Sequence, residues 1–192
     1  MAETKKRVLM LLSNPYRPDS RVYNEALTLA GNGYSITIIA WDRDGNWPEK
    51  ETKDGIDIIR VGPRAEGKKH FIRNIRRFWK NAELAAGQLQ FDSVHAHDFD
   101  TLPPGWLAAR LLRRRVVFDG HEPYGEAFAR SLPAAVASIL LWLERCLVPK
   151  VDCLVSPSEG SAVYYNCVRV GARDDDRCSG SNSKLARLHR QC

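Results

Sequence analysis

The sequence lacks any long apolar segment. Val8 to Leu12 is too short for the apolar region of a secretory signal, and Leu132 to Leu143 is too short to span a bilayer. The second stretch is either a buried helix or a helix that touches a membrane surface. We therefore expect a cytoplasmic protein, with a peripheral position at the inner face of the membrane as the alternative.

Cysteine and glycine are arranged in ways that exclude two common classes of protein. The five cysteines are an odd number without a Cys-x-x-Cys pair, which gives neither a disulfide framework nor a zinc signature, so we expect reduced thiols. The turn from Asn14 to Arg21 follows the first apolar run and has no Gly-x-Gly-x-x-Gly motif. The close backbone approach that a dinucleotide pyrophosphate needs is missing, and we predict no cofactor.

What the sequence contains is a regular alternation of short β-branched apolar runs with longer amphipathic segments, which is typical of parallel βαβ units. A chain of 192 residues with this pattern fits one domain. We predict an α/β fold, a Rossmann-like domain over residues 1–166 with a mainly parallel six-stranded sheet flanked by helices. The predicted strands are 7–13, 35–41, 56–61, 93–97, 115–119 and 151–156, and the predicted helices are 20–32, 68–89, 101–112 and 126–147.

The final segment, residues 167–192, is polar and lacks apolar periodicity. Three of the five cysteines occur there. We expect a disordered tail, either natural or produced by a truncated or frame-shifted gene end.

Polar residues follow the predicted strands, at the sheet edge where ligands of such folds bind. In the first of these positions, Arg17 and Arg21 lie near the start of a helix, where they either hold an anion or are simply solvated.

The segment 95–100, His-Ala-His-Asp-Phe-Asp, follows a strand and has several interpretations. We expect the side chains of His95 and His97 to point to opposite sides of the sheet, which disfavours a shared metal. A metal-dependent hydrolase that uses His95, His97 and Asp100 is nevertheless an alternative, because such sites combine His-x-His pairs with later carboxylates. The structural interpretation is a helix cap at Asp100 or Thr101.

His121 and Glu122 directly follow another predicted strand. Gly120 permits a sharp turn or the close approach of a ligand there. Both side chains can serve proton transfer or hydroxyl recognition. A His-Glu pair is often only structural, but its position at the carboxyl end of a strand favours a functional site.

The net charge of +6 indicates an anionic partner. In the segment 68–80, apolar and basic side chains fall on different faces of a helix. Such a helix suits an anionic membrane surface, although a core-packed helix with a solvated basic face is the more common alternative. The predicted membrane-binding residues are Arg73, Arg76, Arg77, Phe78, Trp79 and Lys80.

Six segments occur in the order found in glycosyltransferase family 4, and as a set they resemble that family. They are DSRVYNEA (19–26), DGI (54–56), VHAHD (94–98), TLPPG (101–105), FDGHE (118–122) and DCLV (152–155). The resemblance extends from about residue 7 to 165. It implies a GT-B fold, in which two Rossmann-like domains face a cleft, and it identifies this chain with the N-terminal, acceptor-side half.

The resemblance also implies roles for residues. His121 would line the reaction centre as a catalytic residue with Glu122 beside it, while His97, Asp98 and Asp100 match the acceptor side. We assign Arg17 and Arg21 to acceptor binding as well. Family members generally need no catalytic metal, and we predict none. The sequence departs from the family in the turn 14–16, where many members have Gly-Gly, and in lacking the Glu-x7-Glu signature of the donor domain.

These expectations combine into one predicted function. The chain would be the N-terminal domain of a retaining enzyme that transfers a hexose from a nucleotide sugar to a hydroxyl acceptor, either lipid-linked or free, in glycolipid or cell-envelope polysaccharide synthesis. Without the donor domain it would be inactive. The alternatives are a non-catalytic acceptor- or membrane-binding module and the hydrolase described above. We expect no nucleic-acid partner.

Overall fold

The computed structural model describes residues 5–17, 19–62, 64, 70–123 and 132–170. The chain forms two compact units, Met1–Val116 and Val117–Cys192. The boundary between them falls inside a strand, β6 (Arg115–Asp119).

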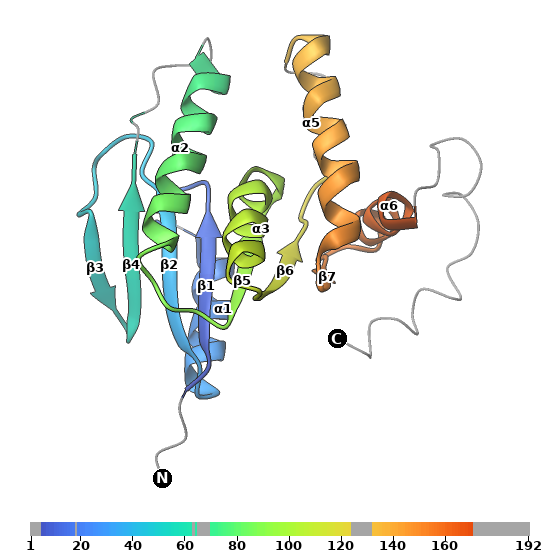
Figure 1. The fold of residues 1–192 in the computed structure, drawn as a ribbon. Coiled ribbons are helices and arrows are strands. Elements are labelled where there is room, and N and C mark those ends of the chain that lie inside the picture. The colour runs from blue at the N-terminus through green and yellow to red at the C-terminus, as the bar shows by residue number, and fades with distance from the viewer. Residues whose placement is uncertain (1–4, 18, 63, 65–69, 124–131, 171–192) are drawn as a thin grey trace. The chain divides into compact units, whose positions relative to one another are not determined.

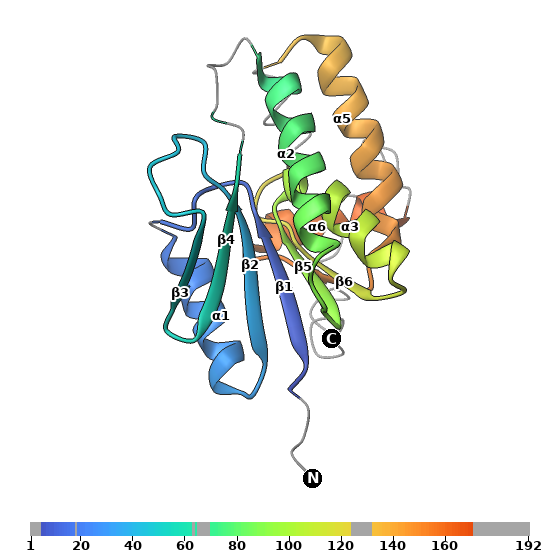
Figure 2. The ribbon, with the colours of Figure 1, turned by 60° about the vertical axis from the view of Figure 1, so that its left-hand side comes forward.

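Among the described residues, the first unit contains five complete strands with helices on both faces (Figures 1 and 2). The strand order is β3-β4-β2-β1-β5, and all neighbours are parallel except β3 and β4. The strands are β1 (Arg7–Leu12), β2 (Ser35–Trp41), β3 (Lys50–Lys53), β4 (Ile56–Val61) and β5 (Ser93–His97). Helix α1 covers one face, and helices α2 and α3 cover the other. These helices are α1 (Ser20–Gly31), α2 (Phe71–Ala86) and α3 (Leu102–Leu111), and a short 3-10 helix, η2 (Phe99–Thr101), precedes α3.

Strand β1 is buried on both faces, because its side chains point alternately into the apolar core on one face of the sheet and into the core on the other. Met10 packs with Val22 and Ala26 of α1 in one apolar cluster. Leu11 points the other way, toward α3, where a β-carbon on Gly105 would lie 2.9 Å from its Cδ1 atom. Gly105 therefore lets α3 lie close against the sheet. Asp19 is the N-cap of helix α1, and its carboxylate accepts a hydrogen bond from the Val22 amide.

The second unit contains β6 and the parallel strand β7 (Cys153–Val155). Between them lie helix α5 (Ala134–Leu147) and the 3-10 helix η3 (Val148–Lys150), and helix α6 (Glu159–Val170) follows β7. The ring of Tyr165 packs edge-on against Phe118, with the ring centroids 5.2 Å apart. Helix α6 thereby covers the end of β6 within this unit.

Helix α5 contains most of the apolar stretch noted in the sequence. Ala137 and Leu147 are buried, whereas Ile139 and Trp142 are 59% and 63% exposed. One face of the helix therefore belongs to the core and the other faces solvent. No described helix combines the length and the apolar character that a membrane span requires.

The predicted fold class is confirmed, and each of the six predicted strands is present. The antiparallel strand β3 and the helix α6 were not predicted. Because α6 includes residues 167–170, the predicted tail begins inside a helix; the rest of it, 171–192, lies outside the described residues, as does the segment 126–131 of the last predicted helix. Cys167 is disulfide-bonded, so the expectation of reduced thiols was wrong for that residue, while Cys146 and Cys153 form no disulfide.

Candidate functional site

The turn after β6 places an aspartate and a histidine next to each other. Nε2 of His121 lies 2.8 Å from Oδ2 of Asp119, and both side chains are at least nine-tenths buried. A carboxylate at this distance favours the imidazole tautomer that carries its proton on Nε2. Nδ1 has no hydrogen-bond partner among the described residues. Both ring nitrogens are buried, and Nδ1 is the one that the Asp119 carboxylate does not contact.

Backbone contacts within the second unit hold this turn in place. The Gly120 amide donates to the Val155 carbonyl at 2.9 Å, and the Ser156 hydroxyl donates to the Gly120 carbonyl at 3.1 Å. From α6, the Ser161 hydroxyl donates to the His121 carbonyl at 2.9 Å. The His121 backbone is thus fixed by both β7 and α6, which restricts the positions that its imidazole can take.

Gly120 is required by packing. A β-carbon at this position would lie 2.3 Å from the ring of Tyr165. The Tyr165 hydroxyl also donates a hydrogen bond to the Glu122 carbonyl at 2.5 Å. The sequence indicated a sharp turn or a close approach of a ligand here, and within this unit the group that approaches is a tyrosine ring. Glu122 itself is exposed, so its carboxylate is available to solvent and to ligands.

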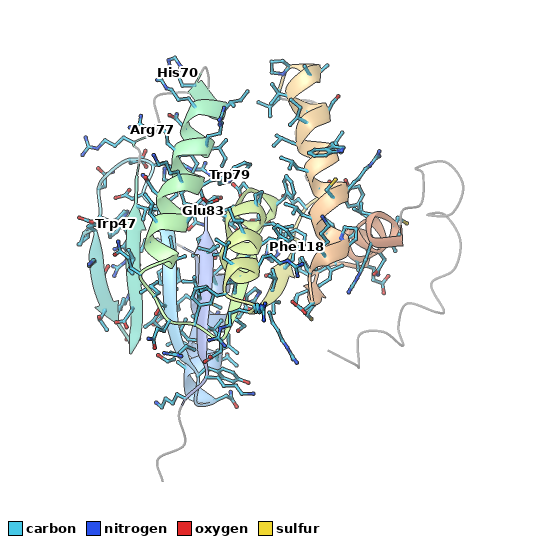
Figure 3. All side chains as sticks on the ribbon, viewed as in Figure 1. Trp47, His70, Arg77, Trp79, Glu83 and Phe118 are labelled. Carbon is cyan, nitrogen blue, oxygen red and sulfur yellow. The ribbon has the colours of Figure 1, made fainter. Side chains whose placement is uncertain are left out.

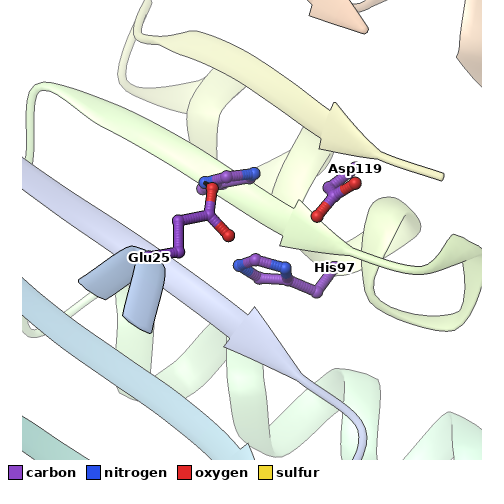
Figure 4. Close-up of side chains that lie close together, drawn as sticks. Glu25, His97 and Asp119 are labelled. Carbon is purple, nitrogen blue, oxygen red and sulfur yellow. Dashed lines mark ion pairs between the residues drawn. The ribbon is translucent and has the colours of Figure 1, made fainter. Parts of the chain in front are cut away.

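His95 and His97 lie on the same side of β5, with their ring centroids 4.3 Å apart. The expectation that they point to opposite sides was wrong, because residues i and i+2 of a strand line the same face. His95 pairs in register with Met10, which faces α1, and Nδ1 of His95 lies 3.4 Å from Oε1 of Glu25 on that helix. Figure 4 shows the Glu25 carboxylate beside the His97 ring.

The acceptor-side candidates Asp98 and Asp100 lie at the end of β5. Asp98 has a φ of 65°, an uncommon conformation for an aspartate, and its carbonyl and that of His97 accept hydrogen bonds from the Thr101 hydroxyl. Asp100 is buried, and its Oδ2 lies 3.8 Å from the guanidinium of Arg43. The hydrolase alternative grouped Asp100 with the two histidines, but the carboxylate grouped with them in this unit is that of Glu25.

The turn between β1 and α1 is stabilised by contacts among its own residues and by contacts of Arg17 with residues outside it. The Tyr16 amide donates to Asn14, and Tyr16 is buried with a φ of 61°. Burial raises the pKa of the Tyr16 hydroxyl to about 12. Arg17 forms an ion pair with Glu51 and lies over the Trp47 ring, 5.0 Å from its centroid. Arg17 is thus engaged within the fold.

Arg21, the second predicted anion-binding residue, is exposed on the first turn of α1. It remains a candidate for acceptor binding.

Helix α2 has the two faces that the sequence predicted, but its apolar face belongs to the core. Phe78 is fully buried and stacks on Trp41 with the ring centroids 4.9 Å apart, and the Trp79 indole donates to the Asp100 carbonyl at 2.6 Å. The assignment of Phe78 and Trp79 to membrane binding is corrected accordingly, since both side chains stabilise the first unit. The exposed residues of the predicted set are Arg73, Arg76, Arg77 and Lys80, and Figure 3 labels Arg77 and Trp79 on this helix.

Two residues of these sites were not predicted from the sequence. Glu25 lies in the middle of α1, where a single carboxylate normally faces solvent, and only the path of α1 across the sheet brings it to β5. Tyr165 belongs to α6, which was not predicted. The spacing of the buried residues Ser161, Ala162 and Tyr165 is a helical signal that indicates this element.

Parallel strands whose connections run through helices define a Rossmann-like α/β fold, and polar residues follow two of these strands at their carboxyl ends. The glycosyl transferase 4-like domain matches residues 18–175, and the chain belongs to that family. The resemblance to glycosyltransferase family 4 is thereby confirmed. No curated protein matches the chain significantly.

Solved structures with a similar fold are glycosyltransferases. Sucrose-phosphate synthase from Thermosynechococcus elongatus has 16% sequence identity and a TM-score of 0.64, and the match covers 84% of this chain and 45% of that one. Arabidopsis thaliana UGT89C1 complexed with UDP-L-rhamnose has 10% identity and a TM-score of 0.53, with coverage of 81% and 46%. The chain thus spans less than half of the length of these enzymes.

Proposed function

We propose that this chain is the acceptor-side domain of a retaining glycosyltransferase, which transfers a hexose from a nucleotide sugar to a hydroxyl acceptor. The acceptor would belong to glycolipid or cell-envelope polysaccharide synthesis. Transfer would require a donor-binding domain besides residues 1–192, because the nucleotide sugar occupies a cleft between two domains in the GT-B arrangement.

The observation that carries the proposal is the Asp119–Gly120–His121 turn. It delivers a nearly buried imidazole at the carboxyl end of a parallel strand, which is where ligands bind in such folds. The imidazole is held by its neighbouring carboxylate and by a backbone anchored from β7 and α6. A polar group fixed before the substrate arrives loses little freedom on binding, and it can therefore contribute to the transition state.

The nucleotide-sugar donor is inferred from the family and from the relatives. The chain shares the fold of a plant enzyme that was crystallised with UDP-L-rhamnose. In a complete enzyme, positive groups of the donor domain would neutralise the phosphates of the leaving group. His121 would orient the transferred sugar or the acceptor hydroxyl.

The remaining candidates fit supporting roles on the acceptor side. His97, Asp98 and Asp100 follow one another at the end of β5, and Arg21 is exposed at the start of α1. Glu122 follows His121 with its side chain exposed, so that it can meet an acceptor hydroxyl. Arg17 is the weakest of the acceptor-binding candidates, because its guanidinium already has a carboxylate partner.

A second candidate function is a membrane-docking module. It is favoured by the four basic residues Arg73, Arg76, Arg77 and Lys80, all exposed on α2. This function and sugar transfer are compatible, because an enzyme with a lipid-linked acceptor works at a membrane surface.

The experiment that tests the proposed function compares the 192-residue chain with a chimera that joins it to the donor-binding domain of another family member. We expect no measurable transfer by the chain alone and acceptor-dependent transfer by the chimera. Turnover of a nucleotide sugar by the chain alone would contradict the proposal that a second domain is needed. Failure of every donor-domain partner, with lipid binding retained, would favour the docking module.

A further inference from the structure

We propose that Glu25, His95 and His97 form a binding site for a divalent transition-metal ion, of which Zn²⁺ is the simplest example. The site lies entirely within the first unit, between helix α1 and strand β5 (Figure 4). The three residues are not part of the His121 turn, to which the proposed function assigns catalysis.

The geometry is close to that of a coordination sphere. The potential ligand atoms of the three side chains lie within 4.8 Å of one another, and Nδ1 of His95 is already 3.4 Å from Oε1 of Glu25. In a tetrahedral site with bonds of 2.0 to 2.1 Å, neighbouring ligand atoms are about 3.3 Å apart. The remaining separations therefore need to close by no more than about 1.5 Å, which small side-chain rotations can supply.

The choice of donor atoms indicates the class of metal. Two imidazole nitrogens and one carboxylate oxygen suit zinc and its first-row neighbours, whereas calcium and magnesium prefer oxygen ligands alone. His95 and His97 project from one face of one strand, so their relative position is set by the backbone of β5 and needs no loop to order.

Burial strengthens the case for a cation at this position. His95 and His97 are 5% and 1% exposed, and the carboxylate that faces them is 31% exposed. A carboxylate turned toward two stacked imidazoles supplies negative charge to a place with little water, where a bound cation interacts strongly. Glu25 is the most exposed of the three residues.

Such an ion would join α1 to β5 and stabilise the first unit whenever it binds. Three protein ligands leave a fourth position for water or for an oxygen atom of a ligand. No chemical step is assigned to the ion, so the proposal does not depend on sugar transfer.

The test is metal binding by the purified 192-residue chain after removal of metal with a chelator. Titration with Co²⁺, followed by visible absorption, reports both the stoichiometry and the ligand type, and Zn²⁺ should displace the Co²⁺. We expect one ion per chain with intense d–d bands typical of a four-coordinate site, and no thiolate-to-cobalt charge-transfer band. The absence of that band separates this site from the cysteines.

Variants connect the binding to these residues. Glu25→Gln keeps the shape of a partly exposed side chain, and His97→Gln removes a buried ligand; each should weaken Zn²⁺ binding about tenfold or more. The matched control is His70→Gln, which changes an exposed histidine at the start of α2 and should leave the affinity unchanged. Circular dichroism checks folding, and if His97→Gln fails to fold, Glu25→Gln decides the question alone. No binding by the wild type, unchanged affinity in Glu25→Gln, or a dominant thiolate band would overturn the proposal.

Discussion

Asp119 and His121 face each other across Gly120, with Oδ2 and Nε2 2.8 Å apart. This contact predicts that neutral His121 carries its proton on Nε2. Nitrogen-detected NMR of the imidazole measures the tautomer directly. Asp119→Ala should shift the population toward the Nδ1–H form, whereas Glu122→Ala, a change at an exposed side chain, should not. An Nδ1–H tautomer in the wild type would show that the carboxylate does not orient the ring.

Gly120→Ala should destabilise the protein because the added β-carbon meets the Tyr165 ring at 2.3 Å. Overpacking of this kind costs roughly 1 to 3 kcal/mol in the free energy of unfolding. The matched control is Gly160→Ala in α6, where the new methyl group meets nothing within 4 Å and should be neutral or stabilise by up to about 1 kcal/mol. Urea denaturation measures both changes, and equal stabilities of the two variants would refute this account of Gly120.

Glu144 should make stability depend on pH. Burial raises the pKa of this carboxyl from 4.5 to about 7, even though the Tyr164 hydroxyl donates to it at 2.7 Å. Between these two values the folded chain holds a proton that the unfolded chain has released, so the free energy of unfolding falls as pH rises from about 4.5 to about 7. The loss amounts to about 3 kcal/mol.

Glu144→Gln keeps an acceptor for Tyr164 and removes the titration. The variant should therefore be more stable than the wild type at pH 8, and the difference should shrink toward pH 4.5. The comparison cancels the contributions of other titrating groups. A difference that stays constant across this range would mean that Glu144 titrates normally.

The exposed basic residues of α2 should attract anionic membranes. Replacing Arg73, Arg76 and Arg77 by glutamine should lower partitioning onto anionic liposomes, because each basic residue near such a surface contributes about 1 kcal/mol. Binding by the wild type should weaken with salt, since charges are screened within about 8 Å at physiological ionic strength.

The control for the α2 substitutions is a second triple variant, which loses the same number of positive charges at other exposed positions. Arg110, Arg113 and Arg115 are exposed at the end of α3 and the start of β6, and their triple glutamine variant should retain more binding. Equal losses in the two triple variants would indicate a response to net charge alone. Unchanged partitioning after the α2 substitutions would leave α2 as a core-packed helix with a solvated basic face.

The sequence predicted the strands well because their apolar runs are nearly continuous. Strands such as β1 and β2 are covered on both faces, and their composition reflects this directly. Strand β3, Lys-Glu-Thr-Lys, has no apolar signal because it is an exposed strand that pairs with β4 at the edge of the described sheet. Edge strands with lysines are a common protection against aggregation, and local pattern alone does not reveal them.

The positions of the site residues were predictable only in part. His121 was found because it follows a strand, and its backbone position needs no long-range information. The partners that position it, Tyr165 and Ser161, come from a helix some forty residues later in the chain. Glu25 is likewise brought to His95 only by the packing of α1, and side-chain contacts of this range are set by tertiary structure.

We propose that this chain supplies the acceptor side of a glycosyltransferase and that His121 acts there. The most direct measurement is sugar transfer from a nucleotide sugar by the chain joined to a donor-binding domain, with wild-type His121 and with His121→Ala. We predict that the variant folds normally and transfers sugar about a hundredfold more slowly, because the loss of an oriented polar contact costs on the order of 3 kcal/mol in the transition state. Full activity of His121→Ala in the joined chain would contradict the account.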